Sequence, residues 1–170
     1  YSYGGLSMNK VKILTYLLFV FLVSCASVVS TKRVDIPKNA SYVVLPFENN
    51  TETPLAGLRV ASIAEGVALS KGYKVLSRVY RETKEYTHTD IENMIRELKE
   101  RGDVDYVITG SVNEFRYKTG IDGEPAVSIT LKIYSLREDR VVLINTGSRT
   151  GWAHESVSTV AQKLLMALLP

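Results

Sequence analysis

An apolar run near the start of the chain limits which residues can belong to a folded domain. It extends from Ile13 to Val23 and stops just before Cys25, the only cysteine in the sequence. A helix of these roughly eleven residues is about 17 Å long, whereas the hydrocarbon core of a bilayer is about 30 Å thick. The run is therefore too short to cross a membrane.

The residues on both sides of the run indicate a secretory signal peptide. Lys10 and Lys12 form a basic region before the run, and small residues follow it, which is the order typical of such signals. We therefore predict that residues 1–24 are a signal peptide, with Met8 as its true start. The run then serves as an export signal and takes no part in the mature fold.

The end of the signal, Leu22-Val23-Ser24-Cys25, resembles the lipobox of bacterial lipoproteins. In that family the cysteine is acylated and becomes the first residue of the mature protein. The resemblance accounts for Cys25, which cannot form an internal disulfide. Each buried acyl methylene contributes about 0.8 kcal/mol, so several chains make a firm anchor. The alternative is an ordinary signal sequence with a cysteine nearby by chance.

The composition is that of an ordinary globular domain. The chain has 170 residues, of which 45% are hydrophobic and 23% charged. The net charge is +3, but the 21 lysines and arginines include Lys10 and Lys12 of the signal, which leaves 19 basic against 18 acidic residues. A nearly neutral domain gives no reason to expect a nucleic-acid partner.

We divide the mature chain into a tether and one domain. Residues 25–39 are polar and short of large apolar side chains, which is typical of a flexible connection. Fully extended, these roughly fifteen residues reach about 50 Å. Residues 40–170 are predicted to form a single domain.

The hydrophobic pattern of this domain predicts an α+β fold, in which helices pack on a mixed sheet in the order β-α-β-α-β-β-β-α. Residues 126–136 alternate between apolar and polar side chains, which indicates a strand with one wet or partner-facing side. Short connections at 120–125 and 137–139 indicate an antiparallel meander. The expected strands are 41–47, 73–79, 105–119, 126–136 and 140–150, and the expected helices begin at Pro54, Thr89 and Glu155.

The sequence offers no set of residues suited to catalysis. His88 and His154 are the only histidines, they lie in separate segments, and neither belongs to a metal-binding motif. Ser111 and Ser128 fall within expected strands and not on a nucleophile elbow. We therefore predict no enzymatic activity, no cofactor and no metal ion.

Two segments resemble the PelC lipoproteins of Pel polysaccharide export. The first begins VLPFENNTETP at Val44 and continues to Arg59, and the second is GWAHES from Gly151 to Ser156, followed by the last helix. Related periplasmic lipoproteins of secretion and cell-wall synthesis share the first segment, so the second carries more weight. The resemblance extends from the lipobox to the end of the chain.

The resemblance implies a non-enzymatic lipoprotein of the outer membrane that faces the periplasm. About a dozen protomers would form a ring beneath the outer-membrane Pel porin and guide a cationic amino-sugar polymer toward it. Cys25 would be the lipid anchor, Trp152 would contact outer-membrane lipid, and Asp122 would face the polymer. Ala26 fits this location, because the resemblance to bacterial lipoproteins implies the outer membrane where the residue after the cysteine is not acidic.

The chemistry of these residues agrees with the implied roles and leaves alternatives open. Tryptophan suits the headgroup region because its ring is apolar while its N–H finds a partner, but Trp152 could instead fasten the last helix to the core. Asp122 and Glu124 lie in a loop with two glycines, where carboxylates could attract ammonium groups or merely support a turn. Basic neighbours such as Arg116 and Lys118 would weaken that attraction.

Two other functions remain as alternatives. A regulator of cell-wall synthases would use a similar domain as a monomeric binding module, and it would need a tether longer than residues 25–39. A secretion-channel subunit would need an additional long amphipathic segment, and none stands out in the sequence.

Overall fold

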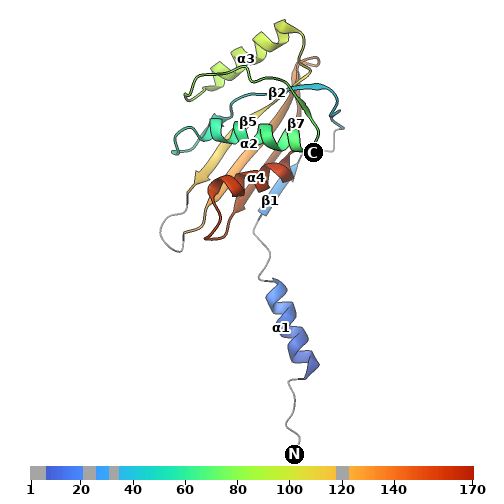
Figure 1. Cartoon of the computed structure of the whole chain (residues 1–170), viewed down its shortest axis with the longest axis vertical. Helices are drawn as coiled ribbons and strands as arrows, with labels where there is room; N and C mark the ends of the chain where they lie inside the picture. The colour runs from blue at the N-terminus through green and yellow to red at the C-terminus, as the bar shows by residue number, and fades with distance from the viewer. Residues whose placement is uncertain (1–6, 21–25, 31–34, 118–122) are drawn as a thin grey trace, which may run out of the picture.

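The computed structural model describes residues 7–20, 26–30, 35–117 and 123–170. A seven-stranded mixed sheet carries helices on its faces (Figure 1), which confirms the α+β class. The predicted order of eight elements is also confirmed, and the structure adds α1, β1 and β3. The helices are α1 (Met8–Val20), α2 (Ala56–Ser70), α3 (His88–Arg101) and α4 (Val157–Leu168).

The strands follow the order β1-β7-β6-β5-β2-β4, with β3 beside β5. The long strands β5, β6 and β7 form the predicted antiparallel meander, whereas β2 and β3 run parallel to β5 and β4 runs parallel to β2. Their bounds are β1 (Ala26–Ser30), β2 (Ser41–Val44), β3 (Glu48–Asn49), β4 (Lys74–Val75), β5 (Tyr106–Arg116), β6 (Ala126–Ser135) and β7 (Arg140–Thr150).

Helix α1 lies within the predicted signal peptide. It has 13 residues, and none of Met8 to Leu18 belongs to the hydrophobic core clusters of the domain. No helix among the described residues has both the length and the apolar character needed to span a bilayer.

The segment predicted as a tether begins with a strand. β1 pairs antiparallel with β7, with Ala26 opposite Arg149 and Ser30 opposite Asn145. The residue that follows Cys25 therefore already belongs to the sheet. A short run such as ASVVS carries no periodic signal strong enough to predict a strand. Only the folded structure shows that these residues pair with the edge of β7.

Helices α2 and α4 cover one face of the sheet (Figure 1). Alternate residues of β6 point into this layer, including Ile129, Leu131 and Ile133, which are fully buried. Burial of each such side chain stabilises the fold by about 1.5–3 kcal/mol. Gly147 allows α4 to approach β7, because a Cβ there would lie 2.8 Å from Cδ1 of Leu164.

Helix α3 lies across the upper part of the other face (Figure 1). Its buried residues Ile91 and Leu98 pack in a second cluster with residues of β2, β5 and the loops beside them. The helix begins with a capping box, in which Thr87 accepts from the N–H of Asp90 and Asp90 accepts from the N–H of Thr87. The sequence predicted the same helix but placed the capping box two residues later, at Thr89 and not at Thr87.

Two further boundaries differ from the sequence expectation. Helix α2 begins after Leu55 and not at Pro54. Leu55 is the N-cap in a left-handed conformation, and its N–H donates to Oε1 of Glu85. The strand expected at 73–79 shrinks to the two residues of β4. Beyond it the chain leaves the sheet, and Tyr80 packs in the core next to Tyr86, with ring centroids 5.7 Å apart.

The close approach of α4 to β7 yields a first prediction. Gly147→Ala should lower the free energy of unfolding by about 1–3 kcal/mol, because the added methyl overpacks the contact with Leu164. Urea unfolding of the purified protein measures the change. Leu164→Val in the same background should recover part of the loss, so that the two substitutions are non-additive. Strict additivity would contradict the contact.

Candidate functional site

Three segments singled out by the sequence meet at one end of the sheet. Ala126 pairs with both Arg116 and Thr150, so the β5–β6 loop and the turn after β7 lie at the same end. β1 starts there too, since Ala26 pairs with Arg149. We call this end, formed by the start of β1, residues 123–125 and residues 151–155, the basal end. It is the lower end of the domain in Figure 1.

The turn after β7 is closed by reciprocal hydrogen bonds. The backbone N–H of Trp152 donates to Oε1 of Glu155 at 3.0 Å, and the N–H of Glu155 donates to the carbonyl of Trp152 at 2.9 Å. Gly151 is buried, and its N–H donates to the carbonyl of Pro125 at 2.9 Å. A side chain at Gly151 would run into Val160, so the glycine lets the turn pack against α4.

Glu155 connects this turn to α4. Its side chain is only 7% exposed, and its Oε2 accepts from Nζ of Lys163 at 2.6 Å. The hydrogen bond from Lys163, then that from the Trp152 backbone, lowers the pKa of Glu155 below its ordinary value, and the charge of Arg149 acts in the same direction. Glu155 is therefore an ionised link between the turn and the helix at neutral pH.

The turn presents Trp152 to the outside. The side chain is 47% exposed although the backbone around it is fixed. Trp152 belongs to neither hydrophobic core cluster of the domain. Contact with lipid remains a prediction, to which the exposed apolar ring at the basal end is suited.

The predicted polymer-binding residues are only partly described. Cys25 and Asp122 lie outside the described residues. Glu124 is exposed, and no described residue forms an ion pair with it. Arg116 lies near the same loop and pairs with Glu114 at 3.7 Å.

The basal end is therefore mixed in charge. Three cations lie on elements next to it: Arg116, Lys163, which is paired with Glu155, and Arg59, which donates to the hydroxyl of Tyr117 and lies over its ring. Each of these cations therefore already has a partner among the described residues. Attraction of a cationic polymer to this end would depend on carboxylates that have no such partner, such as Glu124.

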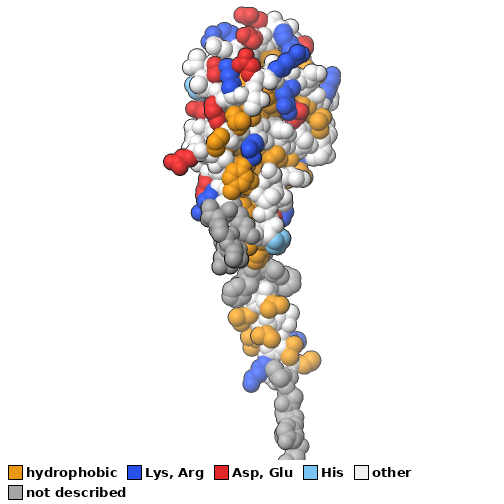
Figure 2. Space-filling model, turned by 60° about the vertical axis from the view of Figure 1, so that its left-hand side comes forward, with side chains coloured by type: hydrophobic (Ala, Val, Ile, Leu, Met, Phe, Trp, Pro, Cys, Tyr) orange, Lys and Arg blue, Asp and Glu red, His pale blue; other side chains and the backbone are white. Residues whose placement is uncertain are grey.

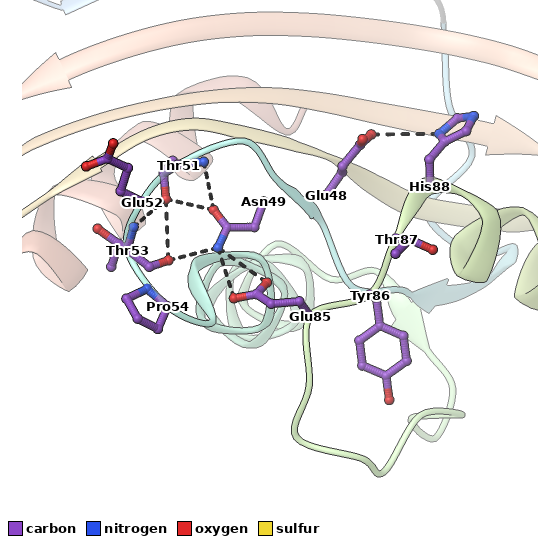
Figure 3. Close-up of a pocket in the computed structure, with 10 residues that line it drawn as sticks. All are labelled: Glu48, Asn49, Thr51, Glu52, Thr53, Pro54, Glu85, Tyr86, Thr87 and His88. Atoms are coloured by element: carbon purple, nitrogen blue, oxygen red, sulfur yellow. Dashed lines mark hydrogen bonds and ion pairs between the residues drawn. The ribbon is translucent and has the colours of Figure 1, made fainter.

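A second polar cluster surrounds the NNTETP motif (Figure 3). Asn49 accepts from Thr51 through Oδ1 and donates through Nδ2 to Thr53 and to Glu85. Glu85 also accepts from the N–H of Leu55 at the start of α2. The polar groups of the motif thus bind one another and hold the entry to α2. Sequence reasoning missed Glu85 because it comes from a distant segment.

His88 lies at the edge of this cluster, between two carboxylates. It is 3.7 Å from Glu48 and 3.0 Å from Glu92, and its side chain is 68% exposed. Among the described residues, no group of three or more His, Cys, Asp or Glu side chains could hold a metal ion. The pocket in Figure 3 is lined mainly by polar side chains.

Comparison with known proteins identifies similar solved structures. The PelC dodecamer from Paraburkholderia phytofirmans is 31% identical, with a TM-score of 0.70, and the match covers 85% of this chain and 96% of that one. A variant of that dodecamer gives 32% identity and a TM-score of 0.72 over the same shares. Lipoprotein GNA1162 from Neisseria meningitidis, at 18% identity and 0.57 over 76% of this chain and 95% of that one, shares the fold. No protein-family model and no curated protein matches.

The link through Glu155 yields a second prediction. Because its pKa is lowered in the folded protein, its stabilising effect is present above the ordinary glutamate pKa of about 4.3 and is lost as the pH falls through the lowered value. Trp152 is the only tryptophan, so its fluorescence reports on the turn. We expect an acid transition in emission that is absent in Glu155→Gln. An identical pH profile in the variant would contradict this role.

Proposed function

Since this chain belongs to the PelC family, we propose that it is a lipid-anchored, non-catalytic ring subunit that guides a cationic polysaccharide to an outer-membrane porin. The observation that carries the proposal is the meeting of β1, Trp152 and the loop of Glu124 at the basal end. Membrane anchor, lipid contact and polymer contact would then all lie at one end of the domain.

Attachment to the membrane follows from the position of β1. Cys25 is bonded to Ala26, so their Cα atoms are about 3.8 Å apart. Ala26 lies opposite Arg149, only three residues before Trp152. Acyl chains on Cys25 would therefore bring the indole of Trp152 to the headgroup region of the same bilayer. In a ring each weak insertion is repeated, and many such contacts add to one stable attachment.

Guidance of the polymer would use weak attractions. An exposed carboxylate such as Glu124 attracts an ammonium group by about 0–1 kcal/mol. A weak attraction suits a polymer that has to keep moving, and a ring repeats it around the opening. Because such attractions are screened by salt, binding should weaken as the ionic strength rises.

The structure gives less support to a regulator of cell-wall synthases. That function needs a long connection between anchor and domain, but β1 brings Ala26 to Ser30 into the sheet. Little chain is then left between Cys25 and the domain.

Membrane contact gives a third prediction, which uses the chain without acyl groups so that the anchor does not hide the effect. Vesicles of phosphatidylethanolamine and phosphatidylglycerol should shift the emission of Trp152 to shorter wavelength, because the ring leaves water. Trp152→Ala should lower vesicle binding severalfold in a flotation assay, and Trp152→Phe should retain part of it. Unchanged emission together with equal flotation of Trp152→Ala would contradict the contact.

Polymer guidance gives a fourth prediction. The mature protein in detergent should bind a partly deacetylated amino-sugar polymer and not an anionic polysaccharide, and binding should fall with added salt. The double variant Asp122→Asn, Glu124→Gln should bind severalfold more weakly. Glu97→Gln, an exposed charge of α3 away from the basal end, is the matched control. Equal weakening in both variants would argue against a specific acidic loop.

A further inference from the structure

The outward surface of α2 and α4 carries few charges for a surface that faces water. Leu69 and Met166 are 54% and 43% exposed. By contrast, α3 exposes Glu92, Arg96, Glu97, Lys99, Glu100 and Arg101. The exposed residues of the other two helices are Arg59, Ser62, Gly66, Leu69 and Ser70 in α2, and Ser158, Gln162, Lys163, Met166 and Ala167 in α4.

The many charged side chains of α3 are typical of a helix whose outer side faces water. Figure 2 shows acidic and basic side chains at the upper end of the domain, which is where α3 lies in Figure 1. We call the exposed residues of α2 and α4 the helix surface. Most of its side chains are small or neutral, and its exposed charges are Arg59 and Lys163. Such a surface is suited to close contact with protein.

Gly66 provides an independent observation on this surface. The other described glycines within helices and strands have a reason inside the monomer: a side chain at Gly57, Gly110 or Gly147 would meet atoms of Phe47, Thr130 or Leu164. At Gly66 no atom of the described residues lies within 4 Å of an added Cβ, and its φ is not positive. Glycine weakens the middle of a helix relative to alanine. A close approach by a second molecule would give this glycine a use.

The opposite face of the fold has a second surface, rich in Ser and Thr, on which the exposed charges Glu114 and Arg116 pair with each other at 3.7 Å. Ser128 and Thr130 alternate with the core residues of β6, so they point away from α2 and α4. Their partners across the strand pair are Ser148 and Thr146. α3 leaves this part of the sheet uncovered. We call it the bare sheet surface, and it comprises Ser27, Val29, Asn113, Ser128, Thr130, Thr146 and Ser148.

Polar groups on the bare sheet surface bind one another. The hydroxyls of Thr130 and Thr146 are 3.1 Å apart, Asn113 donates to Thr130 at 3.2 Å, and Ser148 donates to Ser128 at 3.2 Å. A covering protein would therefore displace few hydrogen bonds to water. Val29, on β1, is 74% exposed and adds apolar area.

We propose that neighbouring protomers pack front to back, with the helix surface of one copy on the bare sheet surface of the next; this rests on the proposed ring. The solved relatives are dodecamers, so a second copy of the chain is the occupant that the observations favour. A closed ring joins two different patches of each protomer. The two patches lie here on opposite faces of the sheet. The basal end stays outside the contact and can therefore meet a membrane.

The test blocks each surface separately in the lipidated mature protein in detergent, with size measured by mass photometry. Gly66→Arg and Ser62→Arg block the helix surface at exposed positions, and Ser148→Arg and Asn113→Arg block the bare sheet surface. Each variant should lose at least nine-tenths of the ring while keeping the circular dichroism of the wild type. Glu97→Lys on α3 should keep the ring.

A mixture distinguishes front-to-back contact from a symmetric one. Gly66→Arg keeps its sheet surface and Ser148→Arg keeps its helix surface, so the two together should form a one-to-one dimer and no ring. Folded variants that keep the ring, or a blocked variant that dimerises alone through a self-complementary contact, would overturn the inference and leave the proposed function standing. A wild-type protein that is monomeric at micromolar concentration would overturn the proposed ring itself.

Discussion

The pairing of β1 with β7 connects the predicted lipid anchor directly to the sheet. Ala26, the residue after Cys25, pairs with Arg149, and the strand continues to Ser30. Hydrogen bonds between the two strands would therefore hold the domain close to the bilayer in a limited range of orientations. An anchor on a flexible linker would leave the orientation free. The proposals for the membrane and for the ring both depend on this difference.

The basal end shows how local packing prepares an exposed aromatic ring. Gly151 lets the turn sit against α4, and Glu155 ties the backbone of Trp152 to Lys163. The backbone is held while the indole stays half exposed. A ring held in this way loses little conformational freedom on contact with lipid, because most of that freedom is already lost in the folded protein.

The rest of the surface consists of a highly charged region over α3 and two less charged faces. α3 places its charges at the upper end of the domain (Figure 2), whereas the charges on or beside the two other surfaces, such as Lys163 and Arg116, are paired within the chain. A nearly neutral domain with such a distribution suits assembly through its two faces. The exposed carboxylates of its loops then remain available to other ligands. Gly66 belongs to this arrangement, since its lack of a side chain has no use in the isolated monomer.

The sequence by itself determined the features that depend on neighbouring residues. The alternation along β6 and the meander of β5 to β7 are local patterns, and they predicted most of the sheet. The length of the apolar run is local too, and the export signal inferred from it stays a prediction. Only the tertiary structure decided the pairing of β1, the early end of β4 and the use of Glu85 to hold the NNTETP motif. These depend on contacts between segments far apart in the chain, and a local pattern carries no information about which distant partner is within reach.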